Sequence, residues 1–325
     1  MRIKTKKETF TVDYPEAVEF ALKQSKAFWH ADEVKVYKDK QDILVNMTEA
    51  ERHGTITVLR LFTKYEQIIG DEFWLNFVYK NYPRPADIQP MAAFFGAVEL
   101  NVHAKFYSKI NEELGLATDE FYNAYKEDPI LLDRIEYLQK TLDDSDELRA
   151  IGKFCFGEGA VLYTSFAYLK HFQSQGKNKA LNLVSGINYS ARDENLHAEA
   201  AAWLFRTVLQ EKREAGLIDE QYEEGLKQDI FKAAEIVLEH EKQIAKKIFE
   251  KGTIPGITET QLIHFAESRI NLCLRNLGYE NLYKVTYNPV ADWFYDGING
   301  FSMIDFFSSQ GNSYERSWSE ADFTF

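Results

Sequence analysis

The sequence predicts an all-α fold, and two observations carry the prediction. Glycine and proline are scarce, with 17 and 7 residues among 325, which disfavours a β fold rich in turns. Hydrophobic residues make up 45% of the chain, and in several long stretches they recur with the 3.6-residue period of a helix. Length alone leaves the number of domains open. We expect one helical domain over residues 1–295 and a flexible tail over residues 296–325.

The first 45 residues are mixed in character, and we expect a short helix and loops there. The first core helix begins at the capping box Thr48-Glu49-Ala50-Glu51, where the Thr48 hydroxyl and the Glu51 carboxylate each accept a backbone hydrogen bond. Apolar residues then follow a helical period as far as Gly70, where we expect the helix to end.

Further long helices follow the prolines at positions 83 and 85, which mark a break in the chain. Core helices are expected over residues 86–115, 145–174 and 180–214, with outer helices over residues 218–250 and 258–277. Four core stretches of this length are on the scale of a four-helix bundle.

The composition changes from about residue 296 to glycine, serine and asparagine with aromatic residues between them. Such a segment cannot bury enough apolar surface to fold by itself. Its aromatic residues favour a tail that docks on a partner, and a strap lying on its own body is the alternative.

The charge balance limits the kinds of partner. Lys and Arg number 38 against 51 Asp and Glu, which gives a net charge of −13 and argues against binding to nucleic acid or to a membrane. No apolar run approaches the roughly 18 residues that span a bilayer, and no signal peptide is evident. The two cysteines, Cys155 and Cys273, form neither a disulfide framework nor a zinc motif. We therefore expect a cytoplasmic protein.

Carboxylates and histidines within apolar helical stretches give the main functional signal. A carboxylate buried without a metal, a partner or a proton is costly. Glu66 falls on the apolar stripe of the first core helix. Glu99 and His103 lie four residues apart in a strongly apolar segment, so both can point at one ion. Glu158 is enclosed by apolar residues and has no basic residue three or four positions away.

Glu194 and His197, three residues apart on the fourth core helix, are weak evidence by themselves. The order of the set strengthens them, because Glu66 lies 33 residues before Glu99. In the second half of the chain, Glu158 lies 36 residues before Glu194. Two hairpins of this kind place four carboxylates and two imidazoles together, which is the ligand count of a dinuclear carboxylate-bridged site. Mostly oxygen ligands favour iron or manganese over zinc or copper.

Other groupings of polar residues are weaker candidates. Glu49 and His53 share the first turn of a helix, and we expect them to face water. Glu239-His240-Glu241 lies in a stretch dense in Glu and Lys, which indicates an exposed face with weak ion pairs. No GxxxxGK[ST], GxGxxG or GxSxG motif is present, so neither a phosphate-binding loop nor a nucleophile elbow is indicated.

The same residues resemble the small, radical-generating subunit of class I ribonucleotide reductase, a ferritin-like di-metal carboxylate protein. The resemblance runs from FWHADEV at residue 28 to the last residue. Its most specific pieces are NVHAKFYSK at 101–109, EGAVLYTSFA at 158–167, SARDENLHAEA at 190–200 and NPVADW at 288–293.

The resemblance implies a ferritin-like bundle in which six residues bind two metal ions. These are Glu66, Glu99, His103, Glu158, Glu194 and His197. Tyr107 matches the tyrosine that is converted to a stable radical. Trp29 and Asp193 match the residues that link the metal pair to the surface, and Tyr314 matches the one that passes the radical to the large subunit.

The first departure from the family pattern lies beside His103. The family usually has Glu-x-x-His on both inner helices, but Leu100 stands three residues before His103 here. We keep Glu99 as the ligand and expect a one-residue helical bulge, a distortion frequent at functional sites. Counting from His103 makes Tyr107 the radical residue, whereas counting from Glu99 gives Phe106, which cannot be oxidised in this way.

The second departure concerns the first core helix, where the family commonly has Asp or Glu. A rigid count back from His103 lands on Ile69. We take Glu66 as the ligand, with Asp71 as the alternative.

The implied function is that of a ribonucleoside-diphosphate reductase small subunit, active only with its large subunit. Tyr107 would give up an electron to an oxidised metal pair, with Leu162 and Phe166 shielding the radical. The metals would be two iron ions, or alternatively a manganese–iron or dimanganese pair. The family also implies a homodimer and an activator, either a flavoprotein or a ferredoxin. It implies docking on the large subunit through a tail that ends in Phe323 and Phe325.

Two other functions use the same fold. A di-metal oxygenase or oxidase would leave Tyr107 inert and would need no aromatic tail. Ferritin-like iron storage fits less well, because the sequence is long for that role and carries the tail.

Overall fold

Local capping interactions set where the helices begin. The Thr48 hydroxyl accepts from the Glu51 amide at 3.2 Å, and the Glu51 carboxylate accepts from the Thr48 amide at 2.8 Å, so the predicted capping box is confirmed. Thr258 and Gln261 form a second capping box. The helix that begins there ends at Gly278, whose φ of +97° is a left-handed conformation that glycine adopts without strain.

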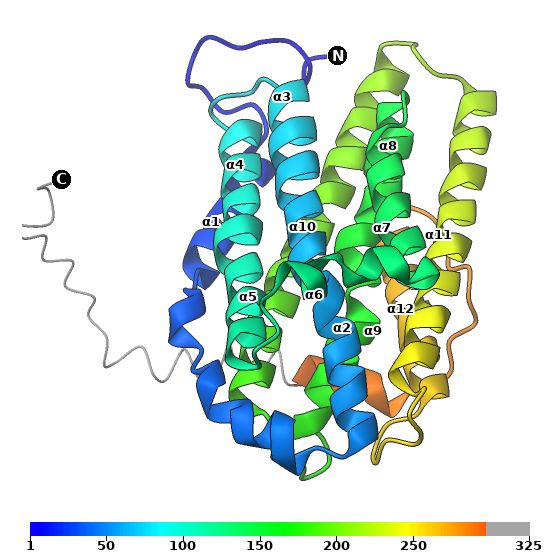
Figure 1. Cartoon of the computed structure of the whole chain (residues 1–325). Helices are drawn as coiled ribbons and strands as arrows, with labels where there is room; N and C mark the ends of the chain where they lie inside the picture. The colour runs from blue at the N-terminus through cyan, green and yellow to red at the C-terminus, as the bar shows by residue number, and fades with distance from the viewer. Residues whose placement is uncertain (297–325) are drawn as a thin grey trace, which may run out of the picture.

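The predicted all-α fold is confirmed. The computed structural model of the chain describes residues 1–296, and these residues form helices with no β-strand among them (Figure 1). The helices are α1 (Pro15–Ala27), α2 (Glu49–Gln67), α3 (Tyr79–Asn81), α4 (Ile88–Val98), α5 (Ala104–Glu113), α6 (Asp119–Asn123), α7 (Pro129–Leu142), α8 (Glu147–Phe156), α9 (Tyr163–Lys170), α10 (Leu181–Glu214), α11 (Glu220–Ile248) and α12 (Glu259–Leu277). None of them is long and apolar enough to cross a membrane.

Short irregular helices connect these elements or interrupt them. Single 3₁₀ turns are η1 (Ala31–Glu33), η2 (Val36–Asp39), η6 (Ala124–Glu127) and η8 (His171–Gln173). Segments with π-helical hydrogen bonding are η3 (Asp42–Asn46), η4 (Ile68–Val78), η5 (Glu99–His103) and η7 (Gly157–Val161). Three of the four core stretches contain one of these π segments, and only α10 runs uninterrupted.

The core consists of two hairpins packed against each other. The first joins α2, η4 and α3 to α4, η5 and α5, and the second joins α8, η7 and α9 to α10 (Figure 1). The outer helices lie outside this core as expected: α11 packs on α2 and α8, and α12 packs on α9 and α10. The structure also contains α7, a helix not predicted from the sequence, and its residue Arg134 has a buried side chain.

The predicted end of the first core helix at Gly70 is wrong. The helical path continues through η4 and α3 to residue 81. Gly70 is instead a point of close helix approach, because a Cβ there would lie 2.8 Å from the Cβ of Glu99. Gly96 has the same role on the facing helix, where a Cβ would lie 2.7 Å from Leu75. Both glycines let α4 approach η4 closely.

The terminal segment, residues 288–296, is anchored to the body of the protein. Phe294 is fully buried, and its carbonyl oxygen accepts from Nζ of Lys170 at 2.7 Å. The Nζ atom also lies 4.1 Å from the centre of the Phe294 ring. The predicted tail beyond residue 296, with Tyr314, Phe323 and Phe325, lies outside the described residues.

The buried Lys170 predicts a specific pH dependence of stability. Burial lowers the pKa of Lys170 from 10.5 to about 7, so unfolding takes up a proton between these pH values and this contribution to stability rises with pH. Relative to the variant Lys170→Met, we expect the wild-type free energy of unfolding to increase by about 1 kcal/mol per pH unit between pH 7 and pH 9. Urea denaturation of both proteins measures it, and a pH-independent difference would contradict the assignment.

Candidate metal centre

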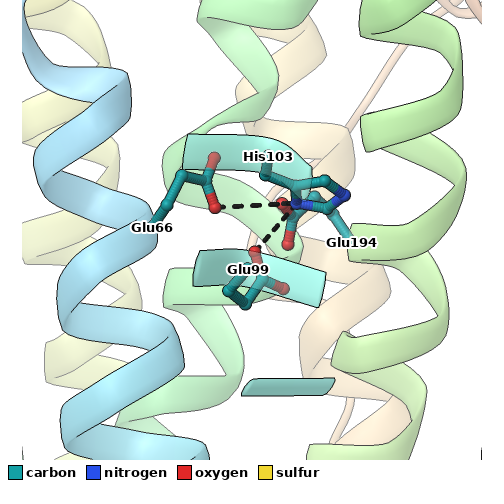
Figure 2. Close-up of side chains that lie close together, drawn as sticks. All are labelled: Glu66, Glu99, His103 and Glu194. Carbon is teal, nitrogen blue, oxygen red and sulfur yellow. Dashed lines mark hydrogen bonds and ion pairs between the residues drawn. The ribbon is translucent and has the colours of Figure 1, made fainter. Parts of the chain in front are cut away.

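The structure brings the six predicted ligand residues together in the middle of the bundle, each with 0% exposure. They are Glu66 on α2, Glu99 and His103 on η5, Glu158 on η7, and Glu194 and His197 on α10. Two groups of four have ligand atoms that all lie within 4.8 Å of one another. The first group is Glu66, Glu99, His103 and Glu194 (Figure 2), and the second is Glu99, Glu158, Glu194 and His197.

The overlap of the two groups is informative. Each contains three carboxylates and one imidazole, and Glu99 and Glu194 belong to both. A residue shared by two neighbouring ion sites has the position of a bridging carboxylate, since its two oxygens can serve different ions. This arrangement has the form of a dinuclear centre with one imidazole for each ion.

The helical bulge expected beside His103 is present. The Ala104 amide donates to the Glu99 carbonyl oxygen five residues back, which is the hydrogen bond of a π helix. The wider turn places the Glu99 carboxylate and the His103 imidazole on one face, with Oε2 and Nδ1 2.8 Å apart. The sequence departure at Leu100 is therefore accommodated by the backbone.

The imidazole of His103 faces three carboxylates at once (Figure 2). Its Nδ1 lies 2.8 Å from Glu99, 3.1 Å from Glu194 and 3.6 Å from Glu66. One ring nitrogen cannot donate a good hydrogen bond to three acceptors, so the arrangement suits a shared cation better than a proton. On the other side of the cluster, Nδ1 of His197 pairs with Glu99 and lies 3.9 Å from Glu194.

Burial and mutual repulsion dominate the electrostatics of the four carboxylates. Burial, followed by the charge of Glu99, raises the pKa of Glu66 well above its usual value. Burial, followed by the charges of Glu194 and Glu99, raises the pKa of Glu158 well above its usual value. Burial and the charges of Glu99 and Glu66 raise the pKa of Glu194 to about 8. Burial also acts on Glu99, but the two imidazoles outweigh it and hold its pKa below the usual range.

The donor atoms fit divalent cations. Neither oxygen of Glu66 has a hydrogen-bond partner among the described residues, and Glu158 has one only for Oε1. Buried oxygens without partners cost free energy, and a cation compensates them as well as the repulsion between carboxylates. The raised pKa values of Glu66, Glu158 and Glu194 have the same cause, which is the burial of uncompensated negative charge. A bound cation would replace the protons that these carboxylates otherwise hold.

Side chains around the cluster fix both imidazoles through their second nitrogens. Nε2 of His103 lies 3.2 Å from Oδ2 of Asp193, and the same oxygen accepts from the Trp29 indole at 2.8 Å. Nε2 of His197 lies 2.9 Å from Oε1 of Gln24, a fully buried residue of α1. Such contacts orient ligand histidines. The structure thus joins Trp29, Asp193 and His103 in one hydrogen-bonded series.

Sequence reasoning missed Gln24 and Trp74. The Trp74 indole donates to Oε1 of Glu158 at 2.6 Å, and its ring contacts His197 edge to face. The signal for Trp74 was available: a first core helix continued past Gly70 would have carried it two turns beyond Glu66. Gln24 lies 173 positions before its partner and gave no such signal.

Tyr107 lies on α5, one turn after His103, and is fully buried. Its ring packs 4.5 Å from that of Phe62, which in turn packs against Phe166 at 5.5 Å. Burial, followed by the charge of Glu66, raises the pKa of Tyr107 well above its usual value.

Phe106, the residue given by the alternative register, points elsewhere. A Cβ on Gly186 of α10 would lie 2.1 Å from the Phe106 ring, so this ring fills the space above that glycine. It also packs against Trp29 at 5.6 Å.

The weaker candidates for polar site residues lie outside the cluster. Asp71, the alternative to Glu66, is exposed and accepts from Asn76 at 3.0 Å, outside the cluster. Glu49 is exposed as expected, whereas His53 is only partly exposed, with Nε2 2.9 Å from the Lys247 carbonyl oxygen.

The expectation of an exposed Glu239-His240-Glu241 is wrong for two of its three residues. His240 is 4% exposed and Glu241 is fully buried. Glu241 pairs with the buried guanidinium of Arg134 at 2.8 Å, and Nε2 of His240 lies 2.9 Å from Asp133. The stripe of α11 that faces the core includes position 241, but the charged residues around it concealed the stripe in the sequence.

Comparison with known proteins gives consistent matches over most of the sequence. The sequence model of the family described as "Ribonucleotide reductase, small chain" matches residues 6–289. A ribonucleoside-diphosphate reductase small chain of Arabidopsis thaliana is 26% identical over 322 residues, which cover 94% of this chain and 87% of that protein.

Two solved structures are similar in fold. Dimanganese(II)-NrdF of Streptococcus sanguinis superposes with a TM-score of 0.77 at 20% identity, covering 90% of this chain and 99% of that one. The ribonucleotide reductase R2 subunit from Clostridium botulinum gives a TM-score of 0.73 at 23% identity, covering 89% of both chains. These two likenesses show the fold.

The Trp74 contact yields a prediction about metal affinity. Trp74→Phe keeps an aromatic ring but removes the donor to Glu158, so that carboxylate loses its orientation. We expect Mn(II) affinity to fall by about tenfold or more, as for other partners of ligating groups. Competition against a chelating dye measures it. Trp203→Phe, at a tryptophan of α10 that lines no part of the cluster, is the matched control, and equal affinities in the two variants would contradict the role.

Proposed function

This chain belongs to the ribonucleotide reductase small-chain family, and we propose that it is the radical-generating subunit of a ribonucleoside-diphosphate reductase. The observation that carries the proposal is the buried cluster of four carboxylates and two imidazoles with a tyrosine beside it. We infer that the tyrosine, Tyr107, stores the radical.

The six cluster residues would hold two metal ions, with Glu99 and Glu194 shared between them. Oxygen donors with one imidazole for each ion suit iron or manganese. We propose two iron ions, with a manganese–iron or dimanganese pair as the alternatives. When bound and oxidised, the metal pair supplies a one-electron oxidant close to Tyr107.

The surroundings of Tyr107 determine which reaction this residue can undergo. A raised pKa means that the phenol holds its proton until it is oxidised, so loss of the electron and loss of the proton occur together. The charge of Glu66 contributes to the raised pKa of Tyr107. Phe62 packs on the Tyr107 ring and Phe166 packs on Phe62. We propose that these rings and the buried Leu162 exclude water and reductants from the radical.

A series of hydrogen bonds joins the cluster to Trp29, a buried residue that precedes η1. Asp193 accepts a hydrogen bond from the Trp29 indole and faces Nε2 of His103. Because both rings contact the same carboxylate, a change of charge on one ring alters the electrostatic potential at the other. We propose that Trp29 and Asp193 carry the radical equivalent from the cluster towards the surface. Tyr314, outside the described residues, would pass it on to the large subunit.

The proposed partners follow from the family. The small subunit acts with a large subunit, and we propose docking through the tail that ends in Phe323 and Phe325. We further propose a homodimer, a cytoplasmic location and activation by a flavoprotein or ferredoxin. An oxygenase on the same fold would not depend on Tyr107, so one variant separates the two functions.

The radical assignment predicts an EPR signal. Protein loaded anaerobically with Fe(II) and then exposed to oxygen should show an organic-radical signal, and Tyr107→Phe should lose it while binding the same amount of iron, because phenylalanine cannot form a phenoxyl radical. Tyr137→Phe, at a partly buried tyrosine of α7, is the control and should keep the signal. A signal that survives in Tyr107→Phe would contradict the assignment.

The docking assignment predicts a loss of turnover without loss of the radical. Replacing Phe323 and Phe325 together by alanine removes two apolar anchors, and buried anchors of this kind dominate binding energy. We expect nucleotide reduction with the large subunit to fall by about tenfold or more at limiting concentration. The EPR signal should stay at its wild-type level. Full turnover by the double variant would exclude docking through these residues.

A further inference from the structure

Arg269, on α12, lies buried between η7 and the terminal segment. Its side chain is 1% exposed, and its Nε donates to the carbonyl oxygen of Gly159 at 2.9 Å. One Nη nitrogen donates to the hydroxyl of Tyr295 at 3.0 Å, and the two Nη nitrogens lie 3.3 and 3.4 Å from Oδ1 of Asn195. One guanidinium therefore contacts the residues that directly follow two proposed ligands, and the terminal segment as well.

A second contact fixes α12 against η7. A Cβ on Gly159 would lie 2.3 Å from Sγ of Cys273, so only glycine permits this approach. Arg269 and Cys273 are one helical turn apart, so both contacts come from the same face of α12. The turn that carries Glu158 cannot move away from α12 without breaking the hydrogen bond, and it cannot move closer without a clash.

The charge of Arg269 makes its contacts interdependent. The other buried arginine of this region, Arg134, donates to the carbonyl oxygen of Val161 at 2.9 Å and has the carboxylate of Glu241 at 2.8 Å. Within residues 1–296, Arg269 has no carboxylate partner and is held by neutral oxygens and an aromatic ring. A buried cation with neutral acceptors only is sensitive to the loss of each one.

The terminal segment sets the position of one of these acceptors. Tyr295 directly follows Phe294, whose carbonyl oxygen and ring are held by Lys170. At the start of the segment, Asn288 donates to the Gln261 carbonyl oxygen at 2.8 Å. The position of the Tyr295 hydroxyl, which Arg269 contacts, is therefore tied to how this segment is held at Asn288 and Phe294.

We propose that Arg269 is a positioning residue that makes the place of Glu158 depend on how the terminal segment is seated. A displaced segment shifts the Tyr295 hydroxyl, then the guanidinium, then the Gly159 carbonyl beside Glu158. The consequence, which rests on the proposed function, is that the seating of residues 288–296 sets the position of Glu158, a proposed metal ligand.

Hydrogen–deuterium exchange of the full metal-free protein tests the coupling. Tyr295→Phe removes only the hydroxyl that Arg269 contacts. Tyr283→Phe is the matched control, because its hydroxyl has no hydrogen-bond partner among the described residues. We expect Tyr295→Phe to speed amide exchange in residues 157–163 by about threefold or more, because a loosened segment opens more often. Residues 99–103, which Arg269 does not contact, should exchange as in the wild type.

Mn(II) binding supplies a second readout on the same two variants. Tyr295→Phe should weaken the binding of one of the two ions, whereas Tyr283→Phe should leave both unchanged. Unchanged exchange at residues 157–163 in Tyr295→Phe, or an equal rise in Tyr283→Phe, would overturn the proposal. Because exchange is measured without metal, a wild-type protein that binds no Mn(II) would contradict the proposed function and leave the exchange result valid.

Discussion

The burial of four carboxylates in one helical core is the constraint on which the rest of the structure depends. An ionised carboxylate in an apolar core costs several kcal/mol unless it is compensated. Two imidazoles compensate part of this cost, and they hold the pKa of Glu99 low while burial and repulsion raise the pKa of Glu66, Glu158 and Glu194. Bound cations would compensate the rest of this free-energy cost. With them, so polar a cluster can lie among fully buried aromatic and aliphatic side chains.

The two hairpins meet this constraint with different backbones. Glu194 and His197 are three residues apart on the uninterrupted α10, whereas Glu99 and His103 are four residues apart on η5. A π turn holds more residues than an α turn, so four positions along it cover nearly the same arc as three along an α helix. The π segment thus allows both hairpins to present one carboxylate and one imidazole in similar positions, although their sequence spacings differ.

The sequence predicted the elements whose signals are local, and it failed where the signal is a contact between distant segments. Capping boxes, apolar periodicity and polar residues within apolar stretches were enough for the fold class and for the six clustered residues. Gly70 resembled a helix end because the sequence does not show that Glu99 packs against it. Glu241 resembled a surface residue because its compensating charge, Arg134, lies 107 positions away. The preference for Glu66 over Asp71 rested on the apolar stripe, and the structure puts only Glu66 in the cluster.

The helices outside the four-helix core support the candidate metal centre, because they supply hydrogen-bond partners to buried polar groups around it. α1 contributes Gln24 to His197. α7 and α12 contribute arginines that donate to carbonyl oxygens of η7, and α11 contributes the carboxylate of Glu241 that balances one of them. A bundle reduced to its four core stretches would leave three groups without these partners: Nε2 of His197 and the carbonyl oxygens of Gly159 and Val161. Buried polar groups without hydrogen-bond partners cost free energy. The cluster therefore relies on α1, α7, α11 and α12 as well as on the four core stretches, because these outer helices supply the partners of its buried polar groups.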